Sequence, residues 1–235
     1  MITCVKKAFI DIPATKYYKY HGLIKPCNIQ PDPVCFLTYD TGEPWGPPIE
    51  RTFSAYYDVG WNYSDFNYTD AHDHVSGGIY GPYIGQSKED FGGGLFLYQF
   101  YRMGVVWDTV ILPWDCRILS AIIQLTITDK WSGVLFDVVV RNGMPNFPHI
   151  TDHIYDYYYD NYWGDFGRNT ITSPGSFEIQ LTEMGCLLIN KDGYTKFALI
   201  SSHDIDRVTP ILNDTIAING LSSFIKLKVV YQEVI

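Results

Sequence analysis

Residues 120–128 read Ser-Ala-Ile-Ile-Gln-Leu-Thr-Ile-Thr. Every second residue from position 121 to position 127 is apolar, whereas positions 124, 126 and 128 carry Gln or Thr. Because successive side chains of a strand point to opposite faces, this alternation predicts a strand with one buried and one solvated face. Antiparallel sheets that are packed on one side show this pattern, so the segment indicates an antiparallel all-β fold.

The same pattern recurs along the chain. It predicts further strands at residues 134–141, 177–181, 196–201 and 225–231, and residues 95–101, apolar on both faces, predict a buried central strand. Only residues 182–193 look helical, with Thr182 as N-cap and Asn190 and Gly193 as stop signals, which predicts two or three turns. The sequence therefore predicts a two-sheet antiparallel β-sandwich, jelly-roll-like, with one short helix.

Composition and charge exclude several classes of protein. The chain has 235 residues, of which 46% are hydrophobic, only 18% charged and 16% aromatic, a balance typical of folded β structure rather than disorder. Its net charge of −9 argues against binding to nucleic acid or to anionic membranes. No stretch approaches the roughly 18 apolar residues of a membrane helix. The N-terminus lacks the apolar region of a secretory signal, so we expect synthesis in a host cytoplasm.

Prolines divide the chain. Seven of the 13 lie in residues 1–52, where their fixed φ and missing N–H disfavour central strands. We expect residues 1–52 to form an N-terminal arm or small docking subdomain, placed on the same chain, another copy or another protein. Residues 53–235 are expected to form the sandwich domain. Long loops at 58–94 and 142–175 are expected to be functional or to contact a partner.

The cysteines form no recognisable framework. No CxxC pair occurs, and no His stands at zinc-finger spacing from a Cys pair. The five residues are Cys4, Cys27, Cys35, Cys116 and Cys186. This usage favours reduced thiols, with a Cys27–Cys35 disulfide as the alternative.

Several sequence segments occur in the same order as in a known family of domains. They are Val105-Val-Trp-Asp-Thr-Val-Ile-Leu-Pro, then Cys116-Arg-Ile-Leu-Ser-Ala-Ile-Ile-Gln-Leu, and finally Phe197-Ala-Leu-Ile-Ser-Ser-His-Asp, Pro210 and Ile225-Lys-Leu-Lys-Val-Val-Tyr. Residues 53–235 thereby resemble the DNRLRE type of β-sandwich, a jelly roll similar to carbohydrate-binding modules. Trp107 stands where that family usually has Phe, and His203 where it often has Arg. Such domains occur in secreted surface proteins and in phage virion and fibre proteins, so the resemblance implies a role of that kind.

Residues 154–167 mix aromatic and acidic side chains: Ile-Tyr-Asp-Tyr-Tyr-Tyr-Asp-Asn-Tyr-Trp-Gly-Asp-Phe-Gly. Aromatic faces beside Asp and Asn suit stacking on sugar rings, although Tyr and Trp are also typical of subunit interfaces. We predict ligand or interface binding for seven aromatic residues in the two long loops. They are Tyr155, Tyr157, Tyr159, Tyr162, Trp163, Trp61 and Tyr63.

Two acidic groups raise the question of a metal. Asp156, Asp160 and Asp165 offer oxygen ligands for Ca²⁺, with a solvated acidic loop as the alternative; no other cofactor is expected. The second group is Asp65, Asp70, His72, Asp73 and His74. It lacks zinc or EF-hand spacing, so we interpret it as a solvated polar loop.

Motifs of the common enzyme classes are missing. The chain has no GxSxG, HExxH, Walker or dinucleotide motif, and the glycines at 92–94 precede a strand rather than a phosphate-binding helix, so we expect no enzyme. We expect instead a virion structural protein: a phage head decoration, fibre or tail-associated component. It would assemble with itself, for example as a trimer, and with other virion proteins. The alternative is a carbohydrate-binding or adhesion module that recognises glycans through its Tyr- and Trp-rich loops.

Overall fold

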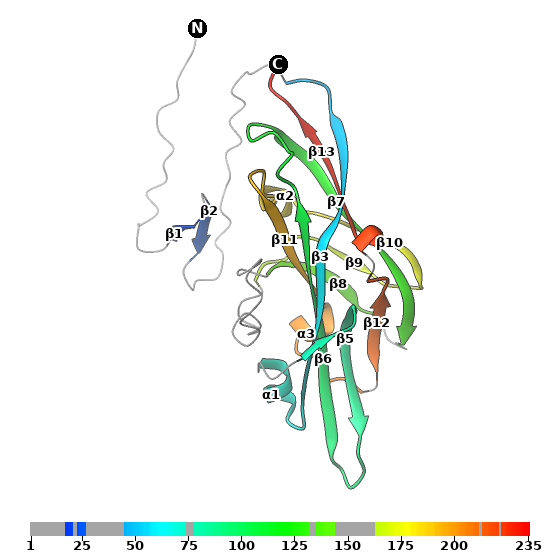
Figure 1. Cartoon of the computed structure of the whole chain (residues 1–235). Coiled ribbons are helices and arrows are strands. Elements are labelled where there is room, and N and C mark those ends of the chain that lie inside the picture. Colours follow the sequence, from blue (N-terminus) through cyan, green and yellow to red (C-terminus); the bar gives the residue numbers. More distant parts are fainter. Residues whose placement is uncertain are drawn as a thin grey trace. The chain divides into compact units, whose positions relative to one another are not determined.

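The computed structural model describes residues 17–20, 23–26, 45–73, 78–131, 135–143, 163–211, 213–220 and 222–235 (Figure 1). The chain divides into two compact units, Met1–Glu43 and Pro44–Ile235. In the first unit, strands β1 (Tyr17–Tyr20) and β2 (Leu23–Pro26) form an antiparallel pair. The second unit begins within the stretch that the prolines assign to the arm, and its first strand starts there too, at Ile49.

The second unit is built from eleven described strands joined by antiparallel hydrogen bonding. They are β3 (Ile49–Asp65), β4 (Gly78–Tyr80), β5 (Tyr83–Asp90), β6 (Phe96–Asp108), β7 (Arg117–Trp131), β8 (Asp137–Asn142), β9 (Arg168–Thr170), β10 (Gly175–Gln180), β11 (Tyr194–Ser201), β12 (Asp214–Ile218) and β13 (Lys226–Gln232). The described helices are α1 (Tyr68–Asp73), α2 (Glu183–Leu187), α3 (Ser202–Ile205) and the 3₁₀ helix η3 (Ser222–Phe224). The predicted all-β, antiparallel class is confirmed.

Two layers of strands enclose the core. One layer runs β10–β7–β13–β3, and the other runs β3–β6–β11–β8–β9. The long strand β3 belongs to both, because its first part pairs with β13 and its second part, from Ala55 onward, pairs with β6. Strands β12 and β5 connect β7 to β6 on the other side, so the hydrogen bonding closes on itself. The result is a sandwich in which the strands themselves join the two layers (Figure 1).

Strand β7 confirms the alternation that predicted the fold. Its apolar residues at 121, 123, 125 and 127 are buried, whereas the polar residues between them are half-exposed. Strands β10 and β13 repeat the pattern. Full burial of each large apolar side chain stabilises the fold by about 1.5–3 kcal/mol. In β11, Ala198 and Ile200 are buried as well as Phe197 and Leu199, because Ile205 of α3 covers its second face.

Glycine is required at two places in this fold. Gly85 has φ of 135°, and a Cβ there would lie 2.1 Å from the backbone oxygen of Asp214, so glycine allows β5 to approach β12. The turn from β5 to β6 contains Gly92, Gly93 and Gly94, all with positive φ. This turn precedes a strand, as predicted, and its glycines have open space around them.

The helices differ from the prediction. Helix α2 starts after Thr182, whose hydroxyl accepts a hydrogen bond from Gly185 N at 3.1 Å, but it has only five residues. The predicted two or three turns are wrong, because the chain leaves the helix so that Asn190 N can bond to Thr195 Oγ1 (3.0 Å). The prediction of a single helix is also wrong: α1 and α3 are too short to show a helical period. The predicted loop 58–94 instead contains the end of β3, α1, β4 and β5.

Candidate functional site

The connection between β6 and β7 presents three large apolar side chains to solvent. Val110 is 52% exposed, Ile111 59% and Trp114 76%, and we call these three residues the apolar loop. Between them, Leu112 is buried in the core and anchors the loop to the sandwich. Single exposed apolar residues are ordinary on protein surfaces, but three within five positions form a patch of the kind that marks interaction sites.

Hydrogen bonds give the apolar loop a defined shape. Leu112 N donates to Thr109 O at 3.0 Å, which closes a tight turn. Arg51 of β3 reaches across and donates from Nη1 to Ile111 O at 3.2 Å. Because these hydrogen bonds order the loop, less conformational entropy is lost when a partner covers it.

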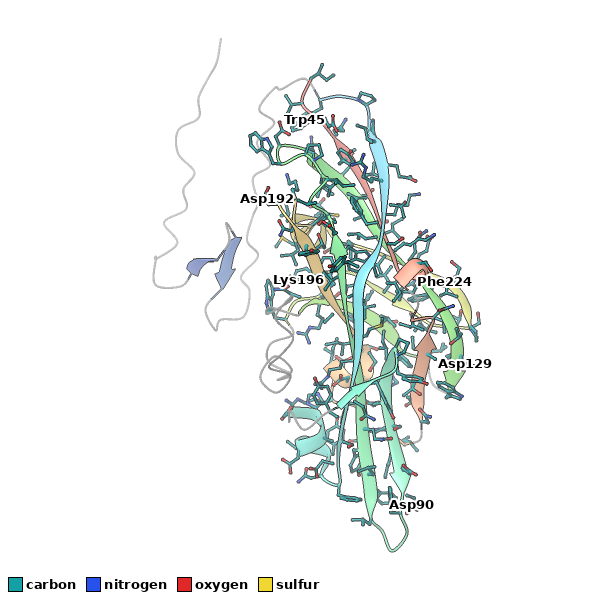
Figure 2. The ribbon with its side chains drawn as sticks, in the orientation of Figure 1. Trp45, Asp90, Asp129, Asp192, Lys196 and Phe224 are labelled. Atoms are coloured by element: carbon teal, nitrogen blue, oxygen red, sulfur yellow. The ribbon has the colours of Figure 1, made fainter. Side chains whose placement is uncertain are left out.

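The apolar loop lies at the same end of the unit as the C-terminus. Arg117, the first residue of β7, pairs with Gln232, the last residue of β13. Beyond Gln232 the chain continues into Val234 and Ile235, which are both exposed. Trp45 forms an isolated bridge with Val234, and Figure 2 shows Trp45 at this end. Five exposed apolar side chains of the described residues, Val110, Ile111, Trp114, Val234 and Ile235, therefore lie at this end.

A second group of side chains is charged, and its three central members are fully buried. We call His72 and Asp73 of α1, Arg102 of β6, Asp204 of α3 and Arg207 the ionic cluster. Arg102, Asp204 and His72 are 0% exposed. Arg102 makes a two-pronged contact with Asp204, donating from Nε to Oδ2 at 2.7 Å and from Nη2 to Oδ1 at 2.9 Å.

His72 joins the two helices within the ionic cluster. Its Nδ1 bonds to Asp73 Oδ1, and its Nε2 lies 2.9 Å from Asp204 O and 3.1 Å from Asp204 Oδ1. Arg102 Nη2 donates to His72 O at 2.8 Å, and Arg207 Nη2 donates to Asp73 Oδ1 at 2.9 Å. These bonds connect α1, β6 and α3, which are far apart in the sequence. Since the central groups are fully buried, a substrate cannot reach them in this conformation.

The surroundings shift the titration of this cluster. Burial opposes the charge on His72, but hydrogen bonds and attraction from Asp204 and Asp73 outweigh it and raise its pKa above the usual range. Burial also opposes the charge on Asp204, yet Arg102 and His72 lower the pKa of this carboxyl. The pKa of Asp73 is lowered in the same way, by His72 and Arg207 against the effect of burial.

A third group of side chains is aromatic. The ring of Tyr83 on β5 lies 5.9 Å from that of Tyr101 on β6 and 5.8 Å from that of Trp131 at the end of β7, and we call these three the aromatic cluster. Trp131 is 44% exposed. Beside the rings, Gln99 Oε1 accepts hydrogen bonds from Tyr101 OH (3.1 Å) and Ser87 Oγ (3.0 Å). Partly open rings next to an amide suit a ligand with both apolar and hydroxyl-bearing faces.

The predicted aromatic site residues are distributed differently. Trp163 packs against the core, with its ring 5.3 Å from Phe166. Tyr63 is only 1% exposed and has the Arg102 guanidinium 4.9 Å from its ring centre, so no open face is left for a sugar. Trp61 lies in β3, opposite Arg102. The remaining four, Tyr155, Tyr157, Tyr159 and Tyr162, lie outside the described residues.

The predicted Ca²⁺ candidates are described only in part. Asp165 accepts hydrogen bonds from the Arg168 guanidinium. Asp156 and Asp160 lie outside the described residues. Among the residues that the structure describes, no group of three or more His, Cys, Asp or Glu side chains is arranged to hold a metal ion.

Three members of the second acidic group, Asp70, His72 and Asp73, lie in helix α1 instead of in the predicted solvated loop. Asn67 Oδ1 accepts a hydrogen bond from Thr69 N at 2.9 Å and so caps α1, which turns His72 inward. Asp65 and Asp70 stay near the surface, and His74 lies outside the described residues. The loop prediction is therefore wrong, and the Asn cap was the available signal for the helix.

Two of the five cysteines fall in the described part of the chain. Cys116 and Cys186 are buried free thiols, and burial raises the pKa of both. Cys4, Cys27 and Cys35 lie outside it, so the Cys27–Cys35 alternative stays a prediction.

A scan of the chain against protein-family models found no match, and a search of curated proteins found no relative. The resemblance to DNRLRE-type domains therefore stays a prediction. Within the described ranges, no helix combines the length and apolar character that a membrane crossing requires.

Proposed function

We propose that the protein is a non-enzymatic structural component of a virus particle that works by assembling with further copies of itself and with other particle proteins. The apolar loop is the observation that supports assembly. The virus-particle setting rests on the resemblance of residues 53–235. Mass spectrometry of purified particles tests that setting, because a structural component is present there in stoichiometric amounts.

The chemistry of the apolar loop suits a protein partner. Residues 110–114 contain no charged side chain, and Trp114 is of the type that most often dominates binding energy at interfaces. The chain as a whole carries a net charge of −9, so two copies repel each other at long range. An uncharged apolar contact is therefore where copies can approach, and salt should strengthen their association by screening the repulsion.

Light scattering of the full chain tests the assembly proposal. We expect a stable oligomer whose mass falls to that of the monomer in the Ile111→Ser, Trp114→Ser double variant. Ile211→Ser is the matched control, since Ile211 is 81% exposed but lies in another loop. A wild-type monomer at all salt concentrations, or an oligomer unaffected by the double variant, would contradict the proposal.

The aromatic cluster favours a second candidate function, binding of a neutral oligosaccharide. Stacked aromatic rings cover the apolar face of a sugar ring, while an amide such as that of Gln99 bonds to hydroxyls. This candidate keeps the predicted glycan-binding activity but moves it from the 154–167 segment to Tyr83, Tyr101 and Trp131. The two functions are compatible in one particle protein.

Calorimetric titration of the full chain with a panel of neutral oligosaccharides tests this candidate. Trp131→Ala should abolish binding, whereas Trp114→Ala, which removes an exposed Trp elsewhere, should leave it unchanged. Equal loss in both variants, or no binding by the parent chain, would remove the candidate.

A further inference from the structure

His72 faces hydrogen-bond acceptors on both sides of its ring. Nδ1 bonds to a carboxylate oxygen of Asp73, and Nε2 lies within 3.1 Å of both the carbonyl and a carboxylate oxygen of Asp204. A neutral imidazole carries one N–H and one acceptor nitrogen, whereas an imidazolium carries two N–H groups. Only the imidazolium donates to both sides, so this geometry selects the charged form.

We propose that His72 is a pH-sensitive lock, held as an imidazolium between Asp73 and Asp204, that releases α1 when it loses its proton. The proposal is independent of the assembly function. It concerns a conformational change within the second unit.

The charges around His72 define the lock. From α1 it faces Asp73, from α3 Asp204, and from β6 Arg102, whose guanidinium binds Asp204 on the other side. Arg207 binds Asp73 from the solvent side, with half of its side chain exposed. When His72 is charged, the carboxylates of Asp73 and Asp204 are balanced by two buried cations, His72 and Arg102. When His72 is neutral, one of its ring nitrogens has a lone pair that faces the lone pair of an oxygen.

The other titratable side chains near His72 lie on α1, β3 and α3. Tyr68, on α1 itself, stacks beside the His72 ring at 6.1 Å, and Tyr63 of β3 lies under the Arg102 guanidinium. Asp65 of β3 accepts a hydrogen bond from Asn67 N. On α3, His203 lies beside Asp214, at 3.8 Å.

Helix α1 depends on this lock for its order. It has six residues, far fewer than an isolated helix needs in water. Its other anchors are Ala71, which is buried, and Tyr68, whose ring contacts those of Tyr98 and Phe100 at 5.6 Å. The bonds through His72, together with the Asp73–Arg207 ion pair, are the charged part of the attachment, so loss of the His72 bonds weakens α1 before it weakens the apolar core.

The direction of the pH effect follows from the shifts. Because the pKa of His72 is raised in the fold, its stabilisation is complete below about 6.5 and is lost as pH rises through the folded pKa. Because the pKa values of Asp73 and Asp204 are lowered, their stabilisation is present above about 3.8 and is lost as pH falls through their folded values. The lock is therefore closed at mildly acidic pH, where His72 is charged and both carboxylates are ionised. It opens when the pH rises through the folded pKa of His72.

Nuclear magnetic resonance of the full chain, with ¹⁵N-labelled histidine, tests the proposal without any substitution. Below its titration midpoint His72 should carry protons on both ring nitrogens, and that midpoint should lie above 6.5. Amide hydrogen exchange of residues 68–73 should then accelerate through the same midpoint, beyond the intrinsic effect of base. Amides of β7 should stay protected. A midpoint at or below 6.5, or exchange in α1 that follows only the intrinsic effect, would overturn the proposal.

A matched pair of variants on α1 tests the part that the Asp73 carboxylate plays in the lock. Asp73→Asn should shift the His72 midpoint downward and release α1 at lower pH. Asp70→Asn removes the same charge from an exposed position of the same helix and should leave both unchanged. Equal midpoints in the two variants would contradict the assignment of Asp73 to the lock.

Discussion

Strand β6 borders two interiors of opposite character. Met103, Val105 and Trp107 enter the apolar core, whereas the preceding residue, Arg102, turns to the other face and enters the ionic cluster. All four side chains are 0% exposed, so their burial is equal and only the chemistry differs. Burial of apolar surface, which is non-directional, stabilises the apolar side. The ionic side depends on hydrogen-bond geometry and on the balance of charges. The two faces should therefore respond differently to substitution and to pH.

The largest effect is expected from Asp204→Ala, because it leaves Arg102 and His72 charged and buried without their shared partner. Removing one member of a buried ion pair costs about 3–5 kcal/mol. Urea unfolding of the full chain measures the loss. Asp206→Ala, two residues away and exposed, should change stability little. Similar losses in both variants would mean that the cluster contributes no more than a surface charge.

The next largest effect is expected from substitution of the two helix caps, one on the apolar side of β6 and one on the ionic side. Thr182 caps α2 on the apolar side, and Ser201 caps α3 on the ionic side by accepting from Asp204 N at 3.1 Å. Substitution of such a cap by Ala costs about 0.5–2 kcal/mol. Ser201→Ala should lie at the upper end, because it also leaves a buried N–H unpaired and loosens Asp204. Thermal unfolding of both variants checks the order, and a larger loss for Thr182→Ala would reverse the comparison.

The smallest effect is expected from Ile123→Val in β7. Loss of one buried methylene costs about 0.5–1.5 kcal/mol. The cost should be the same at pH 6 and pH 9, because the core cluster around Ile123 contains no carboxylate, histidine, lysine or arginine; its polar members are Cys116, Cys186 and Tyr231. Unfolding at both pH values measures this. A pH-dependent cost would show that the core and the ionic cluster are coupled.

The same contrast explains what could be predicted from the sequence. The apolar face was readable because β7, β10 and β13 alternate with a period of two. Strand β3 escaped prediction because its Tyr, Asp, Asn and Gly residues resemble a loop until β6 pairs with them. The ionic cluster could not be predicted, since His72 and Asp204 are 132 positions apart. Its one local sign was an arginine, Arg102, within a largely apolar strand.

The apolar loop could be predicted from the sequence only in part. The sequence Val110-Ile-Leu-Pro-Trp shows apolar residues around a proline between two strands. No periodicity distinguishes the buried Leu112 from the exposed Ile111, because the turn that separates them depends on Thr109 and Arg51. The position of the patch therefore required the structure.

The bridge between Trp45 and Val234 also makes the second unit suitable for circular permutation. Gly46 N donates to Glu233 O at 2.8 Å and Gln232 Nε2 donates to Gly46 O at 2.9 Å, so the start and finish of the fold are fastened together. Residues that face each other in such a bridge have Cα atoms about 4.5–5.5 Å apart. A linker of a few residues would rejoin them, and new termini cut into the open Gly92–Gly94 turn would leave the core intact. The same geometry would allow the unit to be grafted as a guest domain into a surface loop of another protein.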